Sequence, residues 1–162
     1  MKLPKICKGE QLREYFLEYC KPIPNKPDFY EVIKPLPAFK KAYKTEKAHH
    51  KWIPGGYMNI PVIVNLLIPK KAIIYADSEC FITPHMYNRK MRCNIAETHS
   101  IINKYTKKEY TEAKAEYTRY DKKPYIYRKN KIQKPQHRFS YQNDSCASGI
   151  HFFLNLTDAY CY

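Results

Sequence analysis

The chain has 162 residues, and its 29 lysines and arginines against 15 aspartates and glutamates give a formal net charge of +14, with a pI of about 9.4 and a mean hydropathy of -0.68. This length suits one domain with one core, in which roughly 70% of the unfolded surface can be buried. No apolar run reaches the roughly 18 residues of a membrane helix, and residues 1–10 contain no signal-peptide hydrophobic segment, so we expect an intracellular protein not secreted by its own signal.

The amino-acid composition favours strands. Tyrosine occurs 16 times and glycine only 4 times, and tyrosine can cover apolar surface while its hydroxyl stays in water. We therefore predict an α+β fold, a single β-rich domain whose sheet is mixed or antiparallel. We expect residues 1–59 to supply an N-terminal helix, a proline-rich arm and a loop, and residues 60–162 to form the β-rich part of one compact unit.

The N-terminal third predicts a helix followed by extended chain. In residues 9–20, GEQLREYFLEYC, the side chains of Leu12, Tyr15, Phe16 and Tyr19 recur at helical spacing and predict an amphipathic helix. The prolines of residues 21–27 end it. Residues 28–44 contain strand-like stretches interrupted by Pro35 and Pro37, which indicates an edge strand or an extended arm.

The middle of the chain predicts a loop and then three strands. Residues 45–57 contain a Gly-Gly turn and read as a loop. Residues 60–69, IPVIVNLLIP, are the most apolar run and predict the central strand. Residues 72–76, AIIYA, are expected to turn back beside it, and residues 92–102 to form a further strand.

Residues 104–138 form a basic band with tyrosines between the charges. Twelve lysines and arginines minus four acids give this band +8 of the total charge. Residues 106–120 indicate a helix, because acids lie three or four residues from basic partners, and residues 124–132 indicate a strand. Lysines can neutralise phosphates and tyrosine rings can stack on unpaired bases, so the band is our candidate surface for nucleic acid or an acidic partner. An ordinary solvated surface is the alternative. The candidate binding residues are Lys104, Lys107, Lys108, Arg119, Lys122, Lys123, Arg128, Lys129, Lys131, Lys134 and Arg138.

The last 17 residues, CASGIHFFLNLTDAYCY, contain no lysine or arginine. We predict that residues 146–162 form a core strand and a short helix that close the fold. Phe152 and Phe153 are therefore expected in the interior.

Several of these segments occur in a familiar order. The strand ending in isoleucine-proline, the block RCNIAETHSI at residues 92–101, the segment KKPYIYRKNKIQKPQHRF and the closing string CASGIHFFLNLTDAY resemble an uncharacterised domain family found in phage and giant-virus proteins, sometimes beside pentapeptide repeats. The closing string is the most specific part, and the family's K-C-R-A block departs here to R-C-N-I-A. The resemblance covers about residues 60 to 162 and implies a viral origin and a compact domain, with no established activity.

Cys146 and His151 are the candidate catalytic pair. A thiolate becomes a nucleophile beside a base or a positive field, and a turn at Gly149 can bring the two side chains together. The alternative is that both are structural. A further possibility, an ADP-ribosyltransferase-like site, rests on the likeness of the glycine-isoleucine-aromatic strand alone.

The six cysteines lie at irregular intervals without the C-x-x-C spacing of zinc motifs, so we expect no metal, and we expect no cofactor. Because no signal peptide is found, we expect the thiols to be reduced. A zinc site made from distant residues is the alternative. The side chains that could supply ligands are His49, His50, His85, Cys80, Cys93, His99, Cys146 and His151.

These observations together favour a viral protein that acts by binding rather than as an enzyme. We expect a virion component, such as a minor capsid protein, or an accessory factor in the cytoplasm of the infected host. The oligomeric state is left open.

Overall fold

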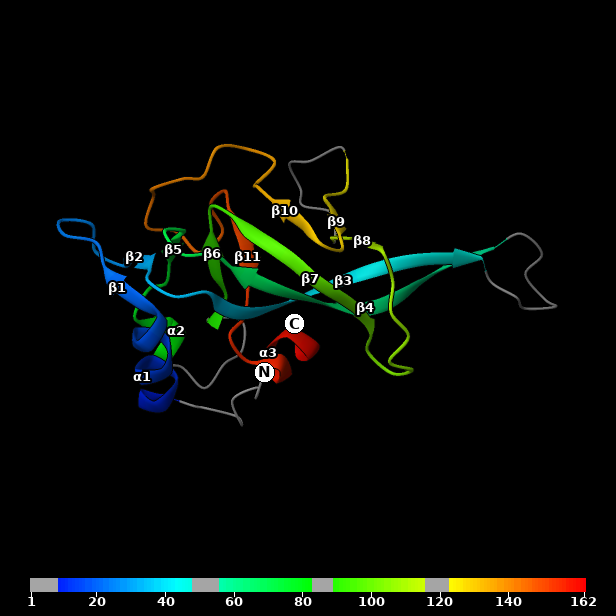
Figure 1. The fold of residues 1–162 in the computed structure, drawn as a ribbon, viewed down its shortest axis with the longest axis horizontal. Coiled ribbons are helices and arrows are strands. Elements are labelled where there is room, and N and C mark those ends of the chain that lie inside the picture. Colours follow the sequence, from blue (N-terminus) through cyan, green and yellow to red (C-terminus); the bar gives the residue numbers. More distant parts are fainter. Residues whose placement is uncertain (1–8, 48–55, 83–88, 116–122) are drawn as a thin grey trace.

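The computed structural model describes residues 9–47, 56–82, 89–115 and 123–162. Two antiparallel sheets carry most of the described chain, with a helix at the N-terminal side and two short helices beside the sheets (Figure 1). The elements are α1 (Glu10–Tyr19), β1 (Cys20–Pro22), β2 (Phe29–Val32), β3 (Leu36–Lys47), β4 (Tyr57–Ile68), β5 (Ile73–Tyr75), α2 (Glu79–Ile82), β6 (Met91–Cys93), β7 (Ala96–Asn103), β8 (Glu112–Lys114), β9 (Ile126–Arg128), β10 (Lys131–Gln133), β11 (Ile150–Phe152) and α3 (Leu156–Cys161). The predicted β-rich α+β fold is confirmed, and its sheets are antiparallel.

The five-stranded sheet has the order β1-β2-β5-β6-β11, and the six-stranded sheet has the order β10-β7-β4-β3-β8-β9. β9 and β10 are the two edge strands of the six-stranded sheet, yet only Lys129 and Asn130 separate them in the chain. Asn130 takes the left-handed backbone conformation of a tight turn, with φ 57°. The six-stranded sheet therefore curls until its two edge strands meet.

The two sheets share one main core, to which α1 contributes Leu12 and Phe16. Alternate residues of β4, Val62 and Val64, point into this core and are fully buried. A second, smaller cluster lies on the other face of the six-stranded sheet, where Phe39 and Ile63 pack against α3. None of the helices in the described residues is long and apolar enough to cross a membrane.

The predicted amphipathic helix and the predicted central strand are confirmed as α1 and β4. The prediction of an edge strand or an extended arm is wrong for β3, which pairs along its whole length with β4 and on its other side with β8 and Phe153. The N–H of Phe39 is directed to Phe153. In a strand, alternate residues direct their N–H groups to the same side, so position 37 faces the same side as position 39. The missing N–H of Pro37 therefore removes no hydrogen bond to β4.

Two further predictions about the strands are also wrong. Residues 72–76 do not return beside β4. Lys71 takes the left-handed backbone conformation, with φ 71°, and its N–H donates to the carbonyl oxygen of Val32. β5 therefore pairs with β2 in the five-stranded sheet. Residues 92–102 form two strands rather than one. Asn94 exchanges hydrogen bonds with the backbone of Ile73, and at this point the chain passes from the five-stranded to the six-stranded sheet.

The basic band also differs from its prediction. Residues 112–114 form β8 rather than part of a helix, and the predicted strand over residues 124–132 is divided by the turn between β9 and β10. Two of the acids that suggested a helix find their partners across the sheet: Glu109 pairs with Lys129 at 2.6 Å and Glu112 with Lys44 at 3.5 Å. Glu116 and the rest of the predicted helix, residues 116–120, lie outside the described residues.

The closing segment folds as predicted. β11 pairs with β6, Phe153 forms an isolated bridge with Phe39, and α3 follows directly. The side chains of Phe152 and Phe153 are both 0% exposed. The end of the chain is therefore an interior strand and a covering helix.

Candidate functional site

Cys146 and His151 do not act on one another in the described geometry. The Nε2 atom of His151 lies 3.2 Å from the carbonyl oxygen of Ala147, which assigns a proton to that nitrogen. The Sγ atom of Cys146 instead accepts from the Nζ atom of Lys90 at 3.4 Å. Burial, together with the charges of Lys40 and Lys90, lowers the pKa of His151 to about 3. The imidazole is therefore neutral and weakly basic at neutral pH, and it is poorly suited to activating a thiol.

The low pKa of His151 predicts an acid-sensitive fold. An unfolded chain protonates this histidine near its ordinary pKa of 6.5, whereas the folded chain does so near 3. The histidine's contribution to stability is therefore complete above pH 6.5 and is lost as the pH falls toward 3. His151→Gln keeps a donor for Ala147 but does not titrate, and it is expected to reduce the stability lost between pH 7.5 and pH 5.0 by about 2 kcal/mol. Urea unfolding of both proteins at the two pH values measures this difference, and equal losses would contradict it.

No group of three or more metal-ligating side chains comes together within the described residues. Cys80 and Cys93 are buried in the core, and burial raises the pKa of both thiols. Cys146 is exposed, and His99 projects from β7 into solvent. His49, His50 and His85 lie outside the described residues. All five cysteines of the described chain are free.

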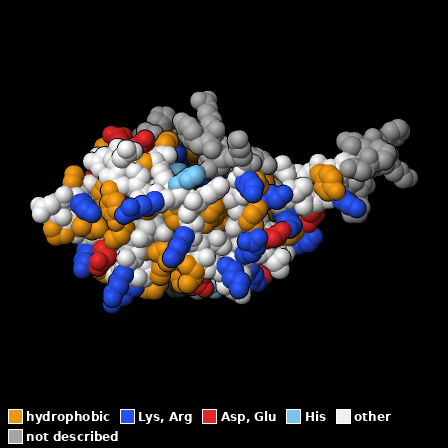
Figure 2. Space-filling model, turned by 90° about the horizontal axis from the view of Figure 1, so that it is seen from above, with side chains coloured by type: hydrophobic (Ala, Val, Ile, Leu, Met, Phe, Trp, Pro, Cys, Tyr) orange, Lys and Arg blue, Asp and Glu red, His pale blue; other side chains and the backbone are white. Residues whose placement is uncertain are grey.

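The basic band is partly neutralised by acids across the sheet. Three of its cations form ion pairs: Lys108 with Glu46 at 3.1 Å, Lys129 with Glu109 at 2.6 Å, and Arg128 with Glu112 at 4.0 Å. Lys123, Lys131, Lys134 and Arg138 are exposed, whereas Arg119 and Lys122 lie outside the described residues. On the face drawn in Figure 2 the basic side chains are scattered, and acids lie beside several of them.

A denser group of cations surrounds the end of α3. The Nζ atoms of Lys104 and Lys107 lie 5.1 and 5.9 Å from the ring centroid of Tyr160. Those of Lys90 and Lys40 lie 5.6 and 5.8 Å from the ring centroid of Tyr162. Such distances permit cation–π attraction. We call the six residues the α3 face: Lys40, Lys90, Lys104, Lys107, Tyr160 and Tyr162.

The polar partners of Lys90, Lys104 and Lys107 are uncharged. Lys104 donates to the carbonyl oxygen of Tyr160 at 3.1 Å, and Lys107 donates to the carbonyl oxygen of Lys104 at 3.2 Å. Lys90 donates to the Tyr162 hydroxyl at 3.5 Å as well as to the Cys146 thiol. Within the described chain no carboxylate forms an ion pair with Lys90, Lys104 or Lys107. These three lysines therefore keep their positive charge. The charges of Lys90 and Lys40 add to the effect of burial, which is the main cause of the lowered pKa of His151.

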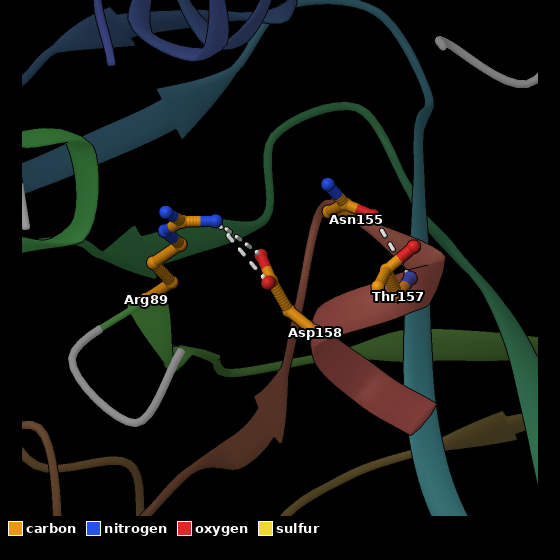
Figure 3. A network of polar contacts seen from close by, with 4 residues as sticks. All are labelled: Arg89, Asn155, Thr157 and Asp158. Carbon is orange, nitrogen blue, oxygen red and sulfur yellow. Dashed lines mark hydrogen bonds and ion pairs between the residues drawn. The ribbon is translucent and has the colours of Figure 1, made fainter. Parts of the chain in front are cut away.

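Buried contacts hold α3 in place beneath these lysines. Ala159 packs against Phe39 and Ile63, and the Asn155 side chain accepts from the N–H of Thr157 at the helix start. Asp158 pairs with Arg89 at 3.2 Å, with only 9% and 7% of their side chains exposed. In Figure 3 the Arg89 guanidinium and the Asp158 carboxylate point toward one another between α3 and the segment leading into β6. Since Lys90 follows Arg89 directly, this ion pair also positions one cation of the α3 face.

A second buried arginine fixes the loop that leads to β11. Arg92 is 0% exposed and donates to four backbone carbonyl oxygens, those of Ser140, Gln142, Asp144 and Ser148. Its guanidinium lies 4.5 Å from the ring centroid of Tyr75 and 5.0 Å from that of Phe139.

Gly149 lies against the aliphatic part of Arg92. A Cβ atom at position 149 would lie 2.9 Å from the Arg92 Cβ, which explains the glycine in the closing string.

Only part of the α3 face could be found from the sequence. Lys104 and Lys107 belong to the predicted basic band, whereas Lys40 lies in β3 and Lys90 precedes β6. Nothing in the local pattern of either residue marks it, because only the tertiary fold brings both to Tyr162.

The fold and this surface define a small basic domain of two antiparallel sheets, closed by a C-terminal strand and helix, with lysines from other elements gathered around the closing helix. The chain belongs to a family of unknown function, DUF5758, whose model matches residues 23–159. The resemblance to an uncharacterised family is thereby confirmed, and the match begins well before residue 60. The blocks that carried it, residues 92–101 and the closing string, are neighbours in space through β6 and β11. No curated protein and no solved structure matches the chain.

Proposed function

We propose that this protein is a non-enzymatic binding module that engages the phosphate backbone of nucleic acid through the α3 face. The observation that carries the proposal is the convergence of four lysines on Tyr160 and Tyr162, with hydroxyl, thiol and carbonyl partners at three of them. Ammonium groups that are not already neutralised by carboxylates can release counterions from a polyanion when they bind it. An acidic protein could use the same charges and is the alternative partner.

The remainder of the basic band is the weaker candidate surface. Lys108, Arg128 and Lys129 each face a glutamate, and a phosphate would have to compete with that carboxylate. Lys131 and Lys134 are exposed on or beside an edge strand, without the ring contacts that group the lysines of the α3 face.

The biological setting belongs to the proposal as well. The resemblance implied a viral protein, and within that setting the chain acts as a virion component or as an accessory factor in the infected cell. Finding the chain in purified particles would favour the first role, and finding it only in cell extracts would favour the second.

The double variant Lys104→Gln/Lys107→Gln tests the surface. We expect it to weaken binding to a fluorescein-labelled single strand in fluorescence anisotropy. The slope of log K against log salt is expected to become shallower by about 1.4, because each lost phosphate contact on a single strand contributes about 0.7.

The matched control is Lys131→Gln/Lys134→Gln, which removes the same charge from the basic band. Its salt slope is expected to stay close to that of the unmodified protein. Equal losses in the two double variants would show that only net charge matters, and no association at low salt would end the proposal. Thermal unfolding of each variant checks that the fold is retained.

A further inference from the structure

Tyr105 stands next to the α3 face and is unusually exposed. Its side chain is 71% exposed, more than any other large apolar or aromatic side chain of the described residues. The Nζ atom of Lys104 lies 5.6 Å from the Tyr105 ring centroid and 5.1 Å from that of Tyr160. One ammonium group is thus within cation–π range of two aromatic rings.

The turn that carries Tyr105 is firmly built. Asn103 is only 5% exposed, and its Oδ1 atom accepts from the N–H groups of Tyr105 at 2.7 Å and Thr106 at 2.9 Å. The backbone of Asn103 also bonds to Lys107 and Lys108. Since the turn is already ordered, a ligand that stacks on Tyr105 does not have to order the backbone first.

We infer that the polyanion bound by the α3 face is an unpaired nucleic-acid strand, with Tyr105 as a platform for one base and Lys104 as the contact for the adjoining phosphate. This inference rests on the proposed function. An ammonium group beside an exposed ring can contact a phosphate while the ring stacks on the neighbouring base, and an exposed aromatic ring can stack on any base. In a duplex the base faces are already stacked on each other, so the Tyr105 ring would find only base edges and backbone.

The geometry of α3 also disfavours a duplex. α3 has 6 residues, and its Ala159 and Asp158 are buried against the protein. A recognition helix has to leave one long face free to enter the major groove. The helix therefore supports the surface but cannot insert into a groove.

The test compares Tyr105→Ala with Tyr57→Ala, which removes a tyrosine of similar exposure, 68%, from β4. The probes are an oligothymidylate, a hairpin duplex with the same number of phosphates, and heparin, each measured by anisotropy or competition. We expect Tyr105→Ala to weaken oligothymidylate binding about tenfold and to leave duplex binding, heparin binding and the salt slope unchanged. Tyr105→Trp is expected to restore the affinity, and Tyr57→Ala to have no effect.

The outcomes separate this inference from the proposed function. If the unmodified protein binds all three polyanions equally and Tyr105→Ala changes none of them, the base-stacking inference is wrong and the binding module stands. If Tyr105→Ala weakens all three equally, the ring does not read bases and the inference is also wrong. If no polyanion binds at low salt, both proposals fail.

Discussion

Arg92→Met is expected to lower the free energy of unfolding by about 4 kcal/mol, because it removes a fully buried side chain that donates to four backbone carbonyl oxygens. Burial lowers the pKa of Arg92, and the guanidinium is held by carbonyl dipoles and aromatic faces. Methionine fills the aliphatic volume but supplies no donor. Urea unfolding at pH 7.5 measures the loss.

The conservative variant and an exposed arginine act as controls for this prediction. Arg92→Lys retains the charge but has fewer donors, and they do not match the geometry of the guanidinium. Its free energy of unfolding is therefore expected to lie between those of the unmodified protein and Arg92→Met. Arg138→Met, at an exposed position, is expected to change stability by no more than about 0.5 kcal/mol. A loss below about 1 kcal/mol for Arg92→Met would show that the loop does not depend on this side chain.

Asp158→Asn is expected to cost about 3 kcal/mol, because it removes the carboxylate that faces the buried Arg89 guanidinium. The effect should be largest around α3, where hydrogen exchange of the helix amides would accelerate before global unfolding. Glu112→Gln is the matched control, since its ion pairs are exposed and worth about 0 to 1 kcal/mol. Equal losses for the two variants would refute a special role for the buried pair.

These two buried arginines connect stability with the proposed surface. Arg89 and Arg92 stand on either side of Lys90, the first anchored to α3 and the second to the loop that carries Cys146. Lys90 is therefore held by a scaffold with little freedom. For a binding surface this preorganisation reduces the entropy lost when a ligand is held.

The elements with a strong local pattern were predictable from the sequence. α1 has apolar residues at helical spacing, β4 has a long run rich in β-branched residues, and the closing segment contains no lysine or arginine. All three fold as predicted. The partners of the short strands were not predictable, because a three-residue strand such as β5 or β6 has too few side chains to specify its neighbour.

The candidate site was predictable only in part, for a related reason. The glutamates of the basic band suggested helical pairs with nearby lysines, yet Lys108 pairs with Glu46, 62 residues away. Lys40 and Lys90 reach Tyr162 from distant positions in the chain. The charge of a segment can be counted from the sequence, but which charges are neutralised depends on strands that pair across long separations.

The central claim is that the buried closing segment presents the α3 face as the binding surface, and mapping the contact by NMR tests it most directly. Backbone amide shifts would be recorded while an oligothymidylate is added at low salt. We predict that the largest shift changes fall on residues 103–107 and 156–162 and on Lys90. Changes concentrated on residues 123–138, with the closing helix unaffected, would contradict the account.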